Sequence, residues 1–61
     1  MSKHVEIECE VLLETELALK ISDGDIEVWI PKSQISDQCE EKGKITSIFI
    51  SQWLATEKGL I

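Results

Sequence analysis

The residues best suited to chemistry in this 61-residue chain are twelve carboxylates, two cysteines and one histidine. Acid–base catalysis needs carboxyls whose pKa values are separated by burial or by a cleft. Glu6, Glu8 and Glu10 alternate along one stretch, so all three are expected to point from one strand face into water. His4 is the single histidine and lies close to the start of the chain, where we expect a solvated side chain rather than a catalytic one. We therefore predict that the protein is not an enzyme and uses no cofactor.

The cysteines, Cys9 and Cys39, lie 30 positions apart and show no CxxC spacing. Together with one histidine they fall short of a four-ligand zinc site. The acidic group around Glu40 lacks the spacing of a calcium-binding loop. We expect no metal site, and a reducing compartment favours free thiols over a disulfide.

The formal net charge of -6, with six lysines and no arginine, opposes binding to phosphates. Nucleic acid is therefore disfavoured as a partner, although the fold could still gather some lysines. No apolar run approaches the roughly 20 residues that cross a bilayer, and no signal peptide is recognisable. These features predict a single domain, residues 1–61, located in the cytoplasm and independent of membranes.

Strict alternation predicts a strand over residues 4–13, with Val5, Ile7, Cys9, Val11 and Leu13 on its buried face. A second strand is expected over 17–22, antiparallel to the first, with Lys20 across from the glutamate face. Asp23-Gly24 then predicts a hairpin with a type I′ turn.

The third strand is expected over 25–31, ending at Pro31. Ile26, Val28 and Ile30 would point inward, so Trp29 and Glu27 would point outward. Residues 36–44 are polar and are predicted to form the longest loop, with an exposed Cys39.

A fourth strand is predicted over 45–50, with either a bulge or a late start at Thr46–Ser47, and a helix is predicted over 52–58. Ser51 is suited to cap the helix, and Gly59 to end it. Trp53 and Leu54 would form its buried face with Ile50. These elements predict a mainly β fold with one short C-terminal helix. We expect a four-stranded antiparallel meander, bent into a small SH3-like or OB-like, partly open barrel, or else a flat sheet capped by the helix.

Two aromatic residues, Trp29 and Phe49, are expected on the outer sheet surface. Either Trp53 and the helix cover them as a second small core, or they form a contact surface for a partner. The candidate partner-binding residues are Trp29, Glu27, Lys32, Ser33, Gln34 and Phe49; the candidate acidic face is Glu6, Glu8 and Glu10.

The segments "WIPKSQI" and "WLATEKGLI", with "ETELALKI" before them, resemble a small domain of bacteriophage and prophage proteins. The resemblance covers residues 14–61. It implies a bacterial cytosolic setting and an accessory role, and it carries over no catalytic residue.

Three functions remain as hypotheses. The first is a non-enzymatic module that binds a protein partner through Trp29 and Lys32 to Gln34. The second is an acidic inhibitor that mimics nucleic-acid charge through Glu6, Glu8 and Glu10, and the third is a single-strand nucleic-acid binder. Edge strands in so small a sheet also leave a homodimer open.

Overall fold

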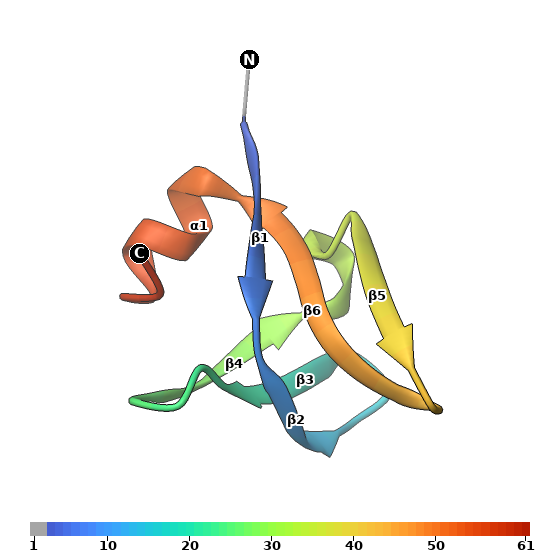
Figure 1. Ribbon diagram of the computed structural model, residues 1–61. Helices are drawn as coiled ribbons and strands as arrows, with labels where there is room; N and C mark the ends of the chain where they lie inside the picture. Colours follow the sequence, from blue (N-terminus) through green and yellow to red (C-terminus); the bar gives the residue numbers. More distant parts are fainter. Residues whose placement is uncertain (1–2) are drawn as a thin grey trace.

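The computed structural model describes residues 3–61, so two residues of the predicted single domain, 1–2, lie outside the described part (Figure 1). Residues 3–61 form six strands, one 3₁₀ turn and one α-helix. In order, they are β1 (His4–Glu8), β2 (Glu10–Glu14), β3 (Ala18–Ser22), β4 (Glu27–Pro31), η1 (Lys32–Gln34), β5 (Asp37–Glu41), β6 (Lys44–Ser51) and α1 (Gln52–Glu57).

The strands form two three-stranded antiparallel sheets, ordered β1-β6-β5 and β2-β3-β4. The mainly β fold with a short C-terminal helix is confirmed, but the four-stranded meander is wrong, and the sheets do not close into a barrel. The predicted first strand, 4–13, divides at Cys9 into β1 and β2. Here the chain bends from one sheet into the other (Figure 1), while the Cys9 N–H still donates to the Thr46 carbonyl at 3.1 Å.

The predicted loop 36–44 contains β5, which pairs with β6. All five residues of β5 are exposed, so the strand lacks the apolar alternation by which strands are recognised. Lys42 and Gly43 connect β5 to β6, with φ values of 55° and 79°. Two consecutive positive φ angles are typical of a type I′ turn. The predicted bulge is confirmed at Thr46, which the register of β5 and β6 leaves unpaired.

A second irregularity, in β2, changes which side chains face the core. The register with β3 shifts between Val11 and Leu13, so Leu12 is the extra residue of a bulge. Leu13, expected inside, is therefore 56% exposed opposite Lys20. A bulge reverses the inside-outside phase of every later residue in its strand, because side chains alternate with period two.

The hairpin between β3 and β4 turns at Gly24 and Asp25. Gly24 has φ 106°, and Asp25 is not among the residues with positive φ. A glycine at the first central position alone is typical of a type II′ turn, so the hairpin is confirmed while the type I′ geometry is wrong. The Asp23 carboxylate accepts hydrogen bonds from the N–H groups of Asp25 and Ile26 and orders this turn.

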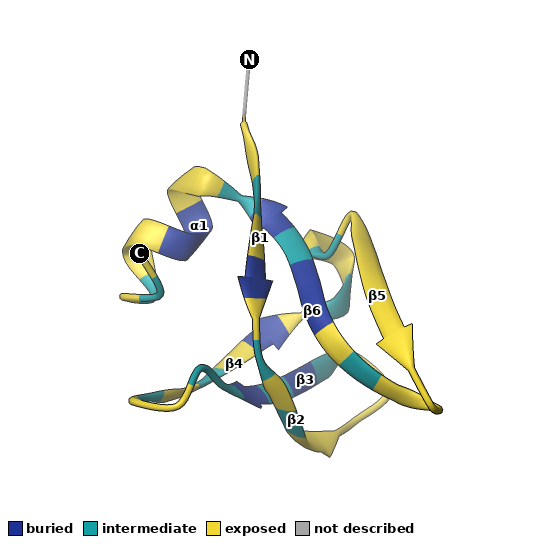
Figure 2. Cartoon of the chain, in the orientation of Figure 1, coloured by how far each residue is buried: buried dark blue, intermediate teal, exposed yellow. Residues whose placement is uncertain are grey.

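The core lies where the two sheets and α1 meet (Figure 2). It is mostly branched aliphatic and contains Ile7, Leu19, Ile21, Ile30, Ile48, Ile50, Leu54 and Ala55. Cys9 is half-buried against it, as the alternation predicts.

Helix α1 begins at a capped end and finishes at a glycine, as predicted. The Ser51 side chain accepts from the Leu54 N–H at 3.1 Å. At the other end, Gly59 has φ 79° and the Leu60 N–H donates to the Ala55 carbonyl at 2.8 Å, the bonding of a Schellman motif. Within residues 3–61, no helix has the length and hydropathy to cross a membrane.

The helix packs against β1 and β6 through Leu54 and Ala55. Trp53, predicted on the buried face, is 69% exposed. A helix of six residues can turn only a narrow strip towards the sheets, and Leu54 and Ala55 fill it.

Candidate functional site

The outer surface of the β2-β3-β4 sheet carries the largest exposed aromatic side chain of the sheets. The register places Leu13, Lys20 and Trp29 in one row across the three strands. The next outward pair along β3 and β4 is Ala18 and Pro31, and Glu27 lies two residues before Trp29. We call this surface the Trp29 face: Leu13, Ala18, Lys20, Glu27, Trp29 and Pro31.

The Trp29 face combines apolar area with one ion pair. Trp29 is 43% exposed and Leu13 is 56% exposed. Between them, the Lys20 ammonium lies 3.5 Å from the Glu27 carboxylate. An exposed pair of this kind contributes about 0–1 kcal/mol to the free energy of unfolding, so the stability of the fold depends little on it.

Helix α1 packs on the other sheet, against β1 and β6, and Trp53 projects into solvent. Of the two alternatives for Trp29, a cover formed by Trp53 is therefore wrong. Trp29 remains open to a partner on a sheet surface that α1 does not cover.

The other partner-binding candidates do not all lie near the Trp29 face. Phe49 lies on β6, in the opposite sheet, where it is half-buried between Glu6 and Asp37. The structure therefore does not join it to Trp29. Residues 32–34 form η1 directly after β4, so Ser33 and Gln34 are exposed near the end of the Trp29 face.

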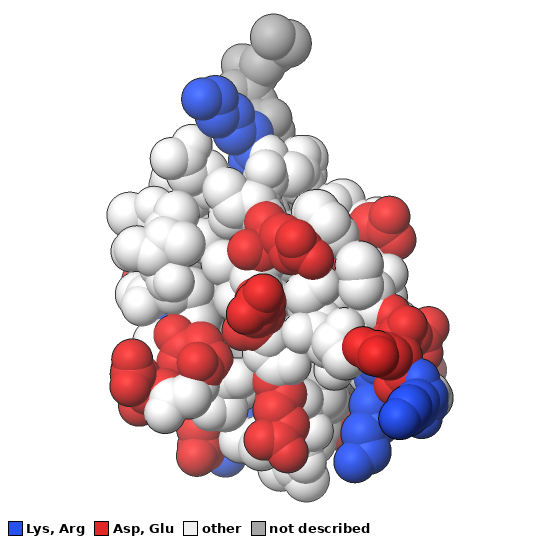
Figure 3. Space-filling model, viewed as in Figure 1, with Lys and Arg blue, Asp and Glu red and all other residues white. Residues whose placement is uncertain are grey.

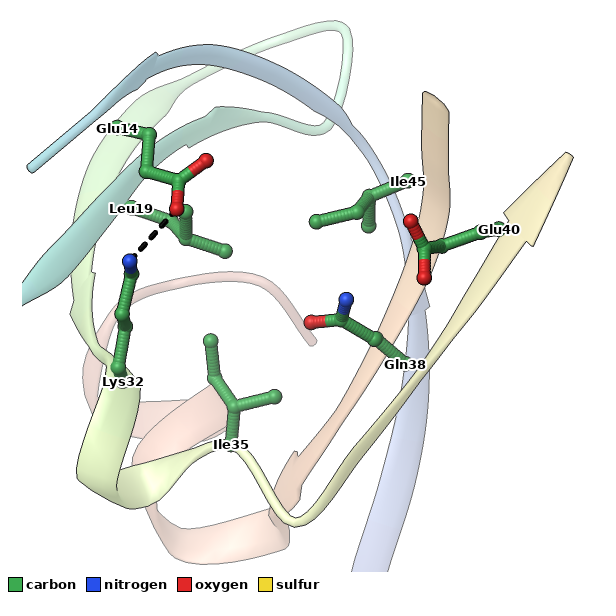
Figure 4. A pocket seen from close by; sticks show the side chains of 7 residues that line it. All are labelled: Glu14, Leu19, Lys32, Ile35, Gln38, Glu40 and Ile45. Atoms are coloured by element: carbon green, nitrogen blue, oxygen red, sulfur yellow. Dashed lines mark hydrogen bonds and ion pairs between the residues drawn. The ribbon is translucent and has the colours of Figure 1, made fainter. Parts of the chain in front are cut away.

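Lys32 is held by an ion pair, its ammonium 2.6 Å from the Glu14 carboxylate. This pair forms one side of a groove of about 390 Å³ that sequence reasoning missed (Figure 4). Gln38 and Glu40 extend from β5 on the opposite side, and apolar side chains lie between these two sides of the groove. The full lining is Glu14, Leu19, Lys32, Ile35, Gln38, Glu40 and Ile45. The bulge in β2 turns Glu14 towards this groove. Gln38 and Glu40 lie on β5, so their position in the groove could have been predicted only if β5 had been recognised as a strand.

The acidic candidates are divided between the sheets. Glu6 and Glu8 extend from β1, whereas Glu10 belongs to β2, opposite Ser22. The Glu6 carboxylate accepts a hydrogen bond from the buried Ser47 hydroxyl at 2.7 Å. Figure 3 shows carboxylates spread over the face on which β1 lies, with lysines at its upper end and lower right. Lys20 contacts Glu27 rather than these glutamates, contrary to its expected position.

The two thiols differ in their surroundings. Burial raises the pKa of the Cys9 thiol and so disfavours its reactive thiolate form. Cys39 is exposed on β5, with its sulfur 3.9 Å from the Glu6 carboxylate. Both are free, and residues 3–61 contain no cluster of histidine, cysteine or acidic residues arranged to hold a metal ion.

Comparisons with protein-family models, curated proteins and solved structures return no match to this chain. The candidate site therefore depends on its own geometry: an open tryptophan, with exposed leucine and proline nearby, on a sheet surface that the helix leaves free.

Proposed function

We propose that the protein is a small non-enzymatic accessory protein that binds a protein partner through the Trp29 face. The observation that carries the proposal is the 43% exposure of Trp29, in one row with Lys20 and the exposed Leu13, on a sheet surface away from α1. Tryptophan is among the residues most enriched at the energetic centres of interfaces. Exposed apolar side chains gathered on one surface are also typical of contact sites.

The proposed setting is the cytoplasm of a bacterium, with a phage or prophage origin. We further propose that the two sheets, joined by the bend at Cys9, form an SH3-like or OB-like, partly open barrel. Such small barrels use a sheet surface and the adjoining loops for binding. Here that combination is the Trp29 face with Lys32, Ser33 and Gln34.

The test compares two tryptophans in a pull-down from bacterial lysate. Trp29→Ala should abolish capture of the partner, because a central interface aromatic contributes about 2 kcal/mol or more. Trp53→Ala is the matched control: it removes the same side chain from an exposed site on α1 and should leave capture intact. Equal capture by both variants, each shown to be folded by circular dichroism, would reject the proposal.

A second candidate function is inhibition by mimicry of nucleic-acid charge. The spread of carboxylates over the β1 face supports it (Figure 3), as does the spacing of roughly 6–7 Å between alternate residues of a strand, which is close to phosphate spacing. Replacing Glu6, Glu8 and Glu10 by lysine should then abolish inhibition of a DNA-processing target. Under the first proposal the same changes should leave partner capture unaffected.

Single-strand nucleic-acid binding is the weakest of the three candidates. Trp29 could stack on a base, but the nearest lysine is already paired with Glu27. A titration with single-stranded DNA at low salt should therefore show no binding.

A further inference from the structure

Strand β4 is an edge strand of its sheet, and within the described residues 3–61 it pairs with β3 alone. Two bonds fix the hydrogen-bonding phase of the β3–β4 ladder. The Lys32 N–H donates to the Leu17 carbonyl at 2.8 Å, and the Asp23 N–H donates to the Ile26 carbonyl at 3.2 Å. In an antiparallel ladder, bonded and non-bonded pairs alternate. Val28 and Ile30 therefore bond to β3.

It follows that the N–H and C=O groups of Glu27 and Trp29 point away from β3, to the free edge. Among residues 3–61, no backbone hydrogen bond outside the ladder reaches either residue. The free edge ends at Pro31, which has no N–H and leads into η1. It thus presents two donors and two acceptors, placed symmetrically about Val28.

We propose that two copies of the chain pair antiparallel through β4, about a twofold axis that passes beside Val28. Glu27 of each copy then lies opposite Trp29 of the other. Each such pair exchanges two N–H···O=C bonds, so the four exposed groups of each copy are all satisfied. The two sheets join into one six-stranded sheet, which aligns two Trp29 faces side by side.

The side chains at this edge suit a second copy. Val28 and Ile26 are half-buried on the inner surface. The twofold brings Val28 against its symmetry mate and places Ile26 opposite Ile30, whose side chain is already fully buried in its own chain. The same register carries the acidic turn at Asp25 towards Lys32 of the second copy. Apolar area is therefore covered at the centre by the two Val28 side chains, and at each end Asp25 comes near a Lys32 that already pairs with Glu14 in its own chain.

Repulsion between two chains of charge -6 opposes this pairing. Salt screens charges that are separated by more than about 10 Å at 0.1 M ionic strength. Dimerisation should therefore strengthen as salt is raised, opposite to the behaviour of an interface held by ion pairs.

The test is sedimentation equilibrium of the full chain from micromolar to millimolar concentration, with amide hydrogen exchange at both ends of the range. We expect a concentration-dependent dimer in which the Glu27 and Trp29 amides become protected. The Val28 amide, bonded within each chain, should be protected at every concentration. A chain that stays monomeric at millimolar concentration, or a dimer with unprotected Glu27 and Trp29 amides, would overturn the proposal.

Two variants at one position separate backbone from side chain. Glu27→Pro removes the outward N–H and hence two of the four intermolecular bonds, so the dimer dissociation constant should rise at least about tenfold. Glu27→Gln keeps the N–H and should dimerise at least as well as the unchanged chain. If Glu27→Pro dimerises normally, the copies do not meet through β4. If Glu27→Pro does not fold, the proposal is judged from the amide hydrogen exchange of the unchanged chain alone.

Discussion

At the scale of single residues, the two tryptophans differ in what surrounds them. Trp29 follows the strand alternation, which sends it outward with Glu27 as predicted from Val28 and Ile30. Trp53 was predicted from helical spacing to be buried, and it is exposed, because the interface of so short a helix is filled by its neighbours. Period-two spacing was the better guide for Trp29, since the ladder with β3 fixes which residues of β4 share a face.

Ser51 offers a direct test of the predicted helix cap. Ser51→Ala removes the acceptor for the Leu54 N–H, so it should lower the free energy of unfolding by about 0.5–2 kcal/mol. Ser33→Ala, at an exposed position of η1, is the control and should change stability by less than about 0.5 kcal/mol. Urea unfolding followed by tryptophan fluorescence measures both, and equal stability of the two variants would contradict the role of the cap.

Asp23 should make stability depend on pH in the acid range. Hydrogen bonds from the N–H groups of Ile26 and Asp25 hold the pKa of its carboxyl below the ordinary value of 3.8. Its stabilising effect is present above the unfolded-state pKa and is lost as pH falls through the folded-state pKa. Asp23→Asn should therefore be the less stable protein at pH 7, and the difference should shrink below about pH 4. A difference that is constant with pH would show that the charge is not responsible.

At the scale of elements, one unrecognised bulge and one unrecognised strand separate the expected sheet from the observed one. Alternation across residues 4–13 predicted one half-buried strand, yet the extra residue Leu12 turns Leu13 outward and Glu14 towards the groove. Thr46 was recognisable because the phase of the apolar residues changes there. Leu12 was not, because its apolar neighbours Val11 and Leu13 conceal the change of phase. The bulge thus supplies one residue of the Trp29 face that sequence reasoning did not include.

The β5–β6 turn provides a test at this scale. Lys42 holds φ 55°, a left-handed conformation that costs most residues roughly 1–2 kcal/mol and asparagine less. Lys42→Asn should therefore stabilise the protein, by about 0.5–1 kcal/mol. Lys44→Asn, just beyond the turn in β6, has no such strain to relieve. Thermal unfolding should show a higher midpoint for the first variant only, and a rise in both would point to the loss of a lysine charge instead.

At the scale of the whole molecule, the arrangement of two sheets depends on features that local patterns do not contain. β5 is exposed throughout and is held by its ladder with β6, and the bend at Cys9 is imposed by packing against both sheets. The aliphatic core residues were largely predictable, since Ile7, Ile21, Ile30 and Ile48 all follow alternation. Which sheet surface remains open depends on where α1 packs, and that follows only from the assembled fold.

The most direct test of the Trp29 face is a nuclear magnetic resonance titration of ¹⁵N-labelled protein with its captured partner. The chain has two tryptophans and hence two indole N–H signals, one on the Trp29 face and one on α1. We predict that the Trp29 indole and the amides of Leu13 and Lys20 shift or broaden, while the Trp53 indole stays unchanged. Shifts centred on Glu6 and Glu8, with an unchanged Trp29 indole, would contradict the account.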